Sequence, residues 1–271
     1  MTLEQSELQQ RLEFAVEAAR DAGTLILEFY QRPDLVVDLK DDRSPVTAAD
    51  RGAEQLLRER IGKMFPDDGV LGEEFDEKPS ANEYRWILDP LDGTKSFVHG
   101  VPLFGTLMGL EFRERVMLGV CRFPALDEVV YAAEETGTWW QVGRGEPRRT
   151  QVTSVAEMSQ ALFCTTTVTG WDTIGRRDAF DRLCEATRMT RGWGDCFGHV
   201  LVATGRADLM IDPQLNAWDA AALVPIIQEA GGHYVDWNGE TSIYTGNGCS
   251  VNAALRDQML ELLQGSGEPA K

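Results

Sequence analysis

The stretch WILDPLDGTKSFVHG, from Trp86 to Gly100, places two aspartates three residues apart between an apolar run and a Gly-Thr turn. The apolar run predicts a buried strand whose last residue is Asp89, because Pro90 forces the chain to turn at the sheet edge. Asp92 follows on that turn. Two carboxylates this close repel each other unless a proton or a cation lies between them, and Mg²⁺ prefers oxygen ligands of this kind. The stretch therefore indicates a divalent-cation site, although Asp-Gly is also a common turn pair and both aspartates could be turn residues.

Gly93 and Thr94 favour a phosphate at this site. Small residues that open a helix present backbone N–H groups to an anion. A metal on the adjacent carboxylates would hold the same anion from its other side. The combination suits a phosphoryl group.

Further acidic residues elsewhere in the chain can complete such a site. Glu73 and Glu74 lie in the sequence GEE, before the predicted strand, and Asp50 lies in SPVTAAD, in a first helical turn after Thr47. Asp219 lies in WDAAA, in the first turn of another predicted helix. A solvated loop would explain the glutamates equally well, and helix capping would explain the aspartates. Taken singly, none of them identifies the site.

Composition limits the classes of partner. The 271 residues are 43% hydrophobic, which suffices for a substantial core, and we expect one unit over residues 1–271. The formal net charge of −18 argues against a nucleic-acid partner and against an anionic membrane surface. Five scattered cysteines show no zinc or disulfide spacing and predict reduced thiols. Because we find neither a signal-peptide pattern nor an apolar run of about 18 residues, we expect a soluble, cytoplasmic protein.

The order of predicted elements divides the unit into two halves. Residues 1–150 predict two amphipathic helices, a functional loop over 66–84, a strand and an antiparallel meander. Residues 151–271 predict alternating strands and helices. In that second half we expect strands at 161–168 and 207–211, and helices at 176–188, 197–205 and 218–232.

At this point the sequence resembles a known family. DPLDGTKSF, GEE, SPVTAAD and WDAAALVPIIQEAGG occur in the order and approximate spacing of the inositol monophosphatase-like family of Mg²⁺-dependent, Li⁺-sensitive phosphatases. The resemblance runs from about residue 10 to 260, and its paired signatures DPxDGT and WDxAA…EAGG are highly specific. It implies an α/β (α+β) fold, the layered αβαβα sandwich of that superfamily. It also implies a phosphate monoester hydrolase with two or three Mg²⁺ ions, commonly a homodimer.

The resemblance assigns metal ligands residue by residue. Glu73, Asp89 and the carbonyl of Leu91 would bind the first metal. Asp89, Asp92 and Asp219 would hold the second.

The same resemblance assigns the catalytic groups. Gly93 and Thr94 match positions whose backbone N–H groups bind phosphate, and Thr94 with Asp50 and Glu73 matches the set that activates the attacking water. A proton would pass through the Thr94 hydroxyl to Asp50 during in-line attack. We find no GxSxG elbow and no P-loop that would supply a competing mechanism.

The sequence indicates the substrate less narrowly than it indicates the metal ligands. Inositol-type members usually show DGTTNF, whereas Lys95 and Ser96 follow Thr94 here, and phosphoadenosine phosphatases carry a similar DGTK. The tracts GVPLFGTLMGL and GDCFGHVLVATGRADLMIDPQLNAWDAAA look most similar to the histidinol-phosphatase branch. The expected substrate-binding residues are Gly93, Thr94, Arg191, Asp195, Asp212 and Asp219.

Asp195 and Asp212 supply the negative charge that would recognise histidinol phosphate, whose alcohol carries an ammonium and an imidazole. Both have simpler explanations, since Asp195 could cap the following helix and Asp212 could lie in an Asp-Pro turn. Inositol 1-phosphate, fructose bisphosphate and phosphoadenosine phosphate stay open as substrates, as does a non-catalytic metal-binding protein with this fold. We interpret His99, His199 and His233 as structural or surface residues.

Overall fold

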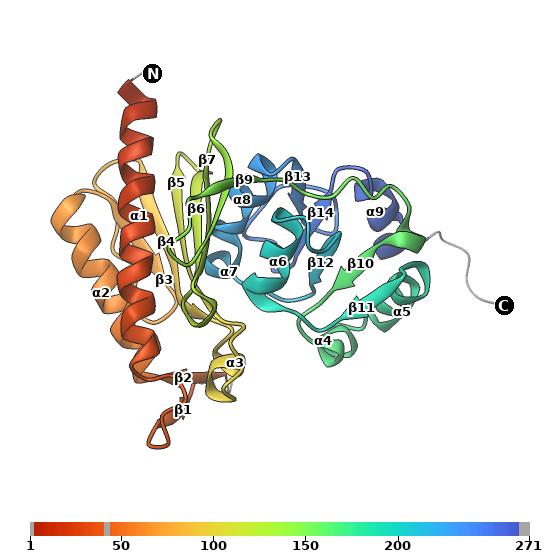
Figure 1. Cartoon of the computed structure of the whole chain (residues 1–271), viewed down its shortest axis with the longest axis horizontal. Coiled ribbons are helices and arrows are strands. Elements are labelled where there is room, and N and C mark those ends of the chain that lie inside the picture. The colour runs from red at the N-terminus through yellow and green to blue at the C-terminus, as the bar shows by residue number, and fades with distance from the viewer. Residues whose placement is uncertain (1–2, 41–43, 266–271) are drawn as a thin grey trace.

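The computed structural model describes residues 3–40 and 44–265, which form alternating layers of helices and sheets (Figure 1). Two helices cover one face of the larger sheet: α1 (Leu3–Leu27) and α2 (Ala48–Met64). Three helices form the middle layer between the two sheets: α6 (Asp195–Ala203), α7 (Ala217–Ala221) and α8 (Leu223–Glu229). Three more cover the far face of the smaller sheet: α4 (Val168–Thr173), α5 (Arg177–Ala186) and α9 (Arg256–Gln264).

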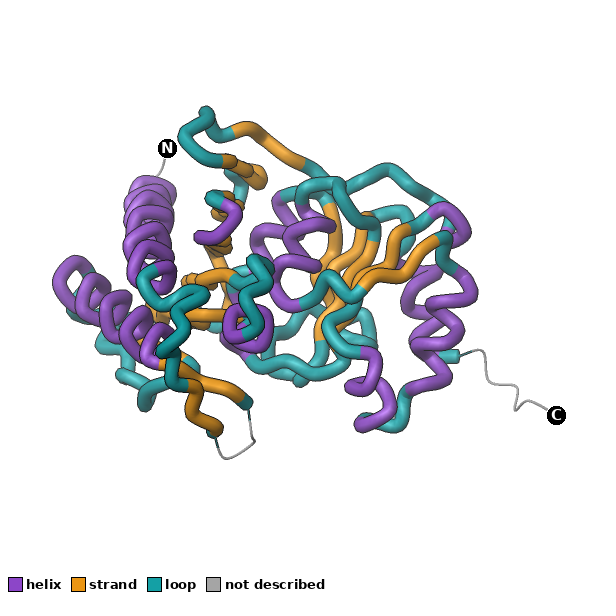
Figure 2. The backbone as a smooth tube through the Cα atoms, turned by 60° about the horizontal axis from the view of Figure 1, so that its bottom comes forward, coloured by secondary structure: helices purple, strands orange, loops and turns teal. Residues whose placement is uncertain are grey.

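This arrangement is the αβαβα sandwich, and it confirms the expected α/β (α+β) fold class. Figure 2, seen from below, shows the middle helices between the two groups of strands. No helix within residues 3–40 and 44–265 is long and apolar enough to cross a membrane. All five cysteines carry free thiols, and four of them are buried.

The larger sheet confirms the predicted meander. Its seven strands lie in the order of the sequence: β3 (Gly69–Gly72), β4 (Tyr84–Asp92), β5 (Gly105–Phe112), β6 (Arg115–Phe123), β7 (Glu128–Ala133), β8 (Gly137–Val142) and β9 (Arg148–Thr150). From β4 onward every pairing is antiparallel. The prediction of an uninterrupted loop over 66–84 is wrong, because β3 pairs with β4 in parallel. Strand β3 has the sequence GVLG, whose two glycines weaken any strand signal.

Strand β4 does not end at Asp89, as we predicted. It continues to Asp92 with a register shift, in which Asp89 pairs with Leu107 and Asp92 pairs with Gly105. A bulge of this kind tolerates Pro90 inside a strand, because the bulged residues need no ladder hydrogen bond. The bulge therefore sets both aspartates on the sheet itself, next to the short helix α3 (Thr94–Val98).

The smaller sheet holds the strands of the second half in the order β11-β10-β12-β14-β13. Their bounds are β10 (Leu162–Cys164), β11 (Met189–Arg191), β12 (Leu209–Asp212), β13 (Gly232–Val235) and β14 (Gly248–Asn252). The strand expected at 161–168 is shorter, because the chain leaves the sheet after Cys164 and begins α4 at Val168. The single helix expected at 218–232 is divided into α7 and α8. We did not predict β13, β14 or α9.

Short elements complete the fold. A two-stranded hairpin of β1 (Val37–Leu39) and β2 (Pro45–Thr47) precedes α2, and Thr47 caps that helix as predicted. Two single 3₁₀ turns occur at η1 (Pro124–Leu126) and η2 (Met158–Gln160). In each, the chain turns briefly between strands.

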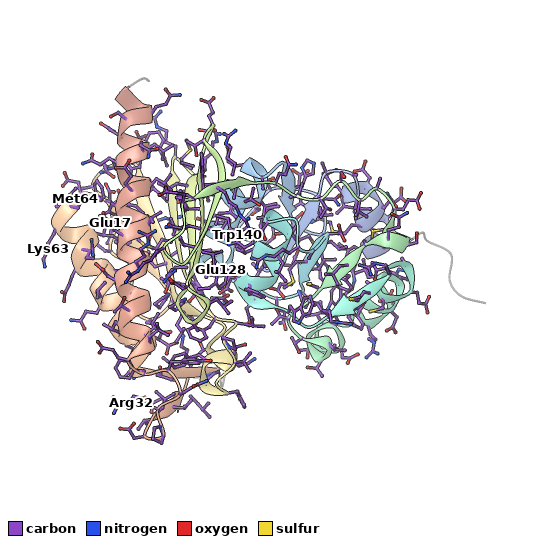
Figure 3. The ribbon with its side chains drawn as sticks, in the orientation of Figure 1. Glu17, Arg32, Lys63, Met64, Glu128 and Trp140 are labelled. Atoms are coloured by element: carbon purple, nitrogen blue, oxygen red, sulfur yellow. The ribbon has the colours of Figure 1, made fainter. Side chains whose placement is uncertain are left out.

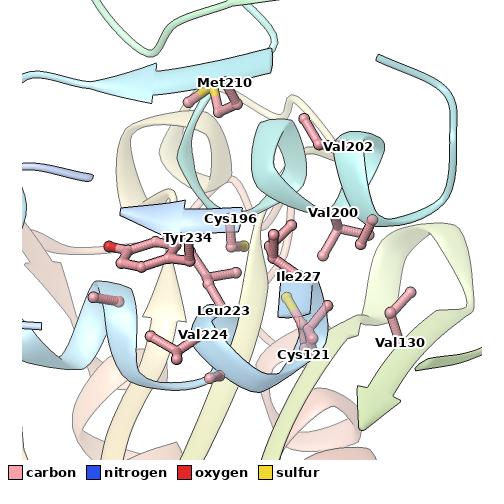
Figure 4. Packing of buried hydrophobic residues seen from close by; sticks show 14 of the residues in the cluster. Cys121, Val130, Cys196, Val200, Val202, Met210, Leu223, Val224, Ile227 and Tyr234 are labelled. Atoms are coloured by element: carbon pink, nitrogen blue, oxygen red, sulfur yellow. The ribbon is translucent and has the colours of Figure 1, made fainter. Parts of the chain in front are cut away.

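The two sheets are joined through a buried apolar cluster of the middle layer. Leu223, Val224 and Ile227 of α8 lie in this cluster with Cys121 of β6 and Val200 of α6 (Figure 4). Within the larger sheet, the indole of Trp140 on β8 donates to Glu128 Oε2 on β7 at 3.0 Å, and both side chains lie between the two halves (Figure 3). Arg206, just after α6, donates to the same Glu128 oxygen at 3.0 Å.

Two glycines allow the middle helices to approach the larger sheet closely. A Cβ atom on Gly119 of β6 would lie 2.0 Å from the carbonyl oxygen of Ala222, and one on Gly109 of β5 would lie 2.8 Å from the Cβ atom of Ala221. Helix α7 carries Asp219, so this close approach also determines how near Asp219 lies to β4.

We predict that Gly119→Ala destabilises the protein by about 1–3 kcal/mol, because the added methyl group would overlap a backbone carbonyl that cannot rotate away. Gly62→Ala is the matched control, since Gly62 lies in α2 with no atom within 4 Å of an added Cβ. That control should stabilise by about 0.5–1 kcal/mol through helix propensity. Urea denaturation of both variants measures the difference, and equal effects would contradict the packing argument.

Candidate active site

A cavity of about 230 Å³ opens where the two halves of the chain meet. Its walls come from the β1–β2 hairpin, the GEE turn, the start of α3, the start of α6 and the segment before α7. The lining residues are Ser44, Pro45, Glu73, Asp92, Gly93, Thr94, Lys95, Thr166, Asp195, Cys196, His199, Asp212, Gln214, Leu215 and Asp219. A hollow of about 420 Å³ lies elsewhere, beside α8, but it lacks the clustered aspartates. The smaller cavity is therefore the candidate active site.

Three aspartates form a cluster at the cavity, and two of them, Asp92 and Asp219, line it. Asp89 and Asp92 of β4 and Asp219 of α7 each place a carboxylate oxygen within 4.8 Å of the others. Burial, followed by repulsion from Glu73 and the other two aspartates, raises the pKa of Asp89 well above its ordinary value. Burial and the carboxylates of Asp195 and Asp219 do the same to the pKa of Asp92.

Backbone N–H groups hold these carboxylates in place. Asp89 Oδ1 accepts from Leu91 N at 3.0 Å, and Asp219 Oδ2 accepts from Asn216 N at 2.6 Å. Asp92 Oδ2 accepts at 2.6 Å from the N–H of Cys196, which lies in the first turn of α6. A rigid group of oxygen ligands with mutual repulsion fits a hard divalent cation.

Glu73 lies beside this group and pairs with a lysine that we did not predict. Glu73 Oε1 accepts from Lys40 Nζ at 2.7 Å, and the same ammonium lies 2.5 Å from Glu74 Oε1. Burial raises the pKa of Glu73 to about 7, and Glu74 and Asp219 add to the rise although Lys40 opposes it. The Glu73 carboxylate is therefore stabilised by the Lys40 ammonium and destabilised by the charge of Asp219.

Glu54 holds the GEE turn and was also missing from our expectations. Its side chain is fully buried on α2, and its Oε2 accepts from Glu74 N at 2.8 Å while its Oε1 accepts from Arg58 Nε at 2.7 Å. A Cβ on Gly72 would lie 2.1 Å from Glu54 Oε1, so this position has room only for glycine. In the sequence, only the four-residue spacing of Glu54 and Arg58 pointed to an ion pair here. The same spacing is common on exposed helix faces, so it did not indicate a buried glutamate.

Asp50 makes both a helix-capping contact and a contact with Thr94. Its Oδ2 accepts from Thr47 N at 2.8 Å and from Thr47 Oγ1 at 2.7 Å, which completes a capping box. Its Oδ1 lies 3.2 Å from Thr94 Oγ1, which is also 2.9 Å from the carbonyl oxygen of Leu91. Burial raises the pKa of Asp50, with Glu74 contributing repulsion, so Asp50 is more basic than an exposed aspartate.

Asp195 presents a carboxylate without a hydrogen-bond donor among the described residues. The N-cap of α6 is Gly194, which forms no side-chain capping bond, and Asp195 follows in the first turn. Its backbone has φ of 51°, a left-handed conformation that few non-glycine residues adopt. Burial, then Asp212 and Asp219, raises the pKa of Asp195 to about 7, against the opposing charge of Lys95.

Asp212 is engaged by protein groups on both oxygens. Thr166 donates to Oδ1 from its hydroxyl and, at 3.3 Å, from its N–H. His199 Nε2 lies 3.2 Å from Oδ2. Arg191, in contrast, is exposed, donates to the carbonyl of Thr190 at 2.8 Å and is not among the cavity residues.

The sequence matches a known protein family over almost its whole length. The profile of the inositol monophosphatase family matches residues 7–268. The chain belongs to this family. Membership makes it a metal-dependent phosphomonoesterase, in agreement with the acidic cluster.

Relatives in the family cover nearly the whole chain. A histidinol-phosphatase of Chlorobaculum parvum is 44% identical over 95% of this chain and 97% of its own length. A histidinol-phosphatase of Mycobacterium tuberculosis is 38% identical, over 85% and 88%. Among solved structures, the extragenic suppressor protein suhB of Bartonella henselae has a TM-score of 0.85 at 28% identity, over 95% of this chain and 99% of that one.

We predict that the metal-free protein loses stability as the pH rises from about 4 toward 7. Carboxyl groups with a raised pKa bind protons more tightly when folded, so their stabilisation is complete below the unfolded pKa. It is lost as the pH passes the folded pKa, which is about 7 for Glu73 and Asp195. Mg²⁺ replaces those protons and should therefore raise the melting temperature more at about pH 8 than at about pH 5.

Thermal unfolding with a chelator or with millimolar Mg²⁺ measures both effects. Asp89→Asn is the matched variant, because it keeps the shape of the shared ligand and removes its charge. It should reduce the Mg²⁺-dependent shift. A melting temperature that Mg²⁺ leaves unchanged at both pH values would contradict the metal assignment.

Proposed function

We propose that this protein is a Mg²⁺-dependent histidinol-phosphatase, which hydrolyses L-histidinol phosphate to L-histidinol and phosphate. The observation that carries the proposal is Asp195, whose carboxylate faces the cavity of the aspartate cluster and has no described donor. An ammonium or imidazolium on the substrate would supply that donor. The likeness to histidinol-phosphatases over nearly the whole chain supports the same substrate.

The metal ligands follow the family pattern. Glu73, Asp89 and the carbonyl of Leu91 would hold one Mg²⁺, and Asp89, Asp92 and Asp219 a second, with the total of two or three left to measurement. Bound Mg²⁺ would supply a Lewis acid that lowers the pKa of water and neutralises charge on the phosphate. For Glu73 to bind the metal, its hydrogen bond with the Lys40 ammonium would have to break.

Asp50 and Thr94 would accept the proton of the attacking water. Thr94 Oγ1 has a single proton and two acceptors within reach, Asp50 Oδ1 and the Leu91 carbonyl. In the contact with Asp50 the Thr94 hydroxyl would donate its proton to Asp50 Oδ1, and the Thr94 oxygen could then accept a proton from water. The raised pKa of Asp50 suits a base. Gly93 and Thr94 would offer their backbone N–H groups to the phosphate.

Asp195 and Asp212 would bind the cationic end of the substrate, and they are not equivalent. Asp195 lacks a described donor, whereas Asp212 already accepts from Thr166 and His199. Asp195 is therefore the primary partner of the cation, and Asp212 contributes charge from a fixed position. A buried cation beside Asp195 would also lower its raised pKa and relieve the repulsion within the cavity.

The deciding experiment is a set of initial rates with Mg²⁺ on histidinol phosphate, inositol 1-phosphate, fructose bisphosphate and phosphoadenosine phosphate. We expect kcat/KM to be highest for histidinol phosphate. A higher value for inositol 1-phosphate would overturn the proposal in favour of an inositol-1-monophosphatase.

We expect the protein to be cytoplasmic and to form a homodimer, and analytical ultracentrifugation tests the dimer.

Thr94→Ala should lower kcat far more than it raises KM. The change removes the hydroxyl that passes a proton to Asp50 but keeps the backbone N–H groups. Thr94→Ser retains a hydroxyl at the same carbon and is the matched control. A variant whose main defect is in KM would place Thr94 in binding alone.

Asp195→Asn should reduce kcat/KM for histidinol phosphate about ten- to a hundredfold, because it removes a charge-assisted hydrogen bond. Slow hydrolysis of glycerol phosphate should change little, since that alcohol carries no cation. Folding stability should hold, because no described donor depends on the Asp195 carboxylate. Asp212→Asn should instead lower stability, because its amide NH₂ would face donors from Thr166 or His199. A uniform loss across substrates for Asp195→Asn would contradict cation recognition.

A further inference from the structure

His199 is a buried histidine at the leaving-group end of the cavity with partners on both ring nitrogens. It lies on α6, its side chain is 1% exposed, and Tyr234 packs against its ring with centroids 6.1 Å apart. Nδ1 lies 2.7 Å from Ser250 Oγ, and Nε2 lies 3.2 Å from Asp212 Oδ2. Neither the metal site nor the proton transfer proposed above uses this imidazole.

The surroundings of Asp212 decide the direction of these hydrogen bonds. Thr166 donates from both its N–H and its hydroxyl to Asp212 Oδ1. Because Asp212 is the acceptor in these contacts, we assign the donor in the contact at Oδ2 to His199 Nε2. Nδ1 of the same ring then accepts from the hydroxyl of Ser250.

The chain of contacts continues to the free carboxylate. The Thr166 hydroxyl, which donates to Asp212, accepts from Asp195 N at 2.8 Å. A Cβ on Gly194 would lie 2.3 Å from the Cα atom of Thr166, so the two segments touch along their backbones. Ser250 on β14 is thus connected through His199, Asp212 and Thr166 to the backbone of Asp195.

We infer that His199 is a positioning residue, which holds the Asp212 carboxylate directed at the leaving alcohol. This inference rests on the proposed function, because a fixed negative charge has a use only if the leaving alcohol carries a cation. Without the Nε2 donor, the Asp212 carboxylate would keep Thr166 as its partner but could rotate at Oδ2. Recognition of a cationic substrate would weaken, and hydrolysis of a neutral one would not.

Two substitutions of nearly equal length separate positioning from simple core packing. In His199→Gln the side-chain amide can replace Nε2 as donor to Asp212, whereas His199→Met fills similar space without a donor. Positioning predicts that the methionine variant raises KM for histidinol phosphate about tenfold and that the glutamine variant retains most of the parent value. Both should hydrolyse glycerol phosphate at the parent rate. A purely structural histidine predicts the reverse order, because a buried amide is tolerated less well than a thioether.

A spectroscopic measurement tests the geometry without any substrate. In protein labelled with ¹⁵N-histidine, His199 should carry a proton at Nε2, and its signals are assigned by their loss in His199→Gln, since the chain has three histidines. The tautomer protonated at Nδ1 would overturn the inference, because Asp212 would then be the donor. If the parent enzyme does not hydrolyse histidinol phosphate, the proposed function fails by itself, and the tautomer alone decides whether His199 holds Asp212. Better retention of activity in the methionine variant would likewise overturn it.

Discussion

Repulsion between carboxylates that the fold brings together is the constraint around which the rest of this structure is arranged. Asp89, Asp92 and Asp219 come from two strand positions and a distant helix, yet their oxygens lie within 4.8 Å. Without restraint, three charged aspartate side chains at this distance would move apart. Here each is restrained by a backbone N–H group that the surrounding elements hold in place. A cation converts this repulsion into binding energy, which explains why an acidic protein concentrates negative charge in one cavity.

The site lies at the joint between the two sheets, and the packing of that joint determines its geometry. The first turn of α6 donates to Asp92, and α7 places Asp219 against β4 and β5. Helix α7 and its junction with α8 could not approach so closely if β5 and β6 carried side chains at Gly109 and Gly119. A change in the apolar contact between the halves therefore acts directly on the distances between the metal ligands.

The cavity has two ends with different chemistry. The end formed by β4 and the start of α3 supplies carboxylates and the Thr94 hydroxyl, which suit a phosphate and its metals. The other end is a hydrogen-bonded series through Thr166, Asp212 and His199 that leaves the Asp195 carboxylate open. The proposed function assigns recognition of the leaving alcohol to this second end.

Local sequence patterns were sufficient for much of this protein. Short β-rich runs separated by turns predicted the meander, Thr47 predicted the start of α2, and the DPLDGT and WDAAA motifs indicated the aspartates of the site. These features depend on contacts between residues close in sequence. The bulge after Asp89, the parallel pairing of β3, the contact of Glu54 with Glu74, and the partners of Lys40 and His199 depend instead on residues 13 to 51 positions away. No local pattern encodes such a partner, because a buried polar side chain is satisfied by whichever group the packed layers bring within about 3 Å. The sequence by itself determined the chemical groups and the layers, and the tertiary structure decided which groups meet.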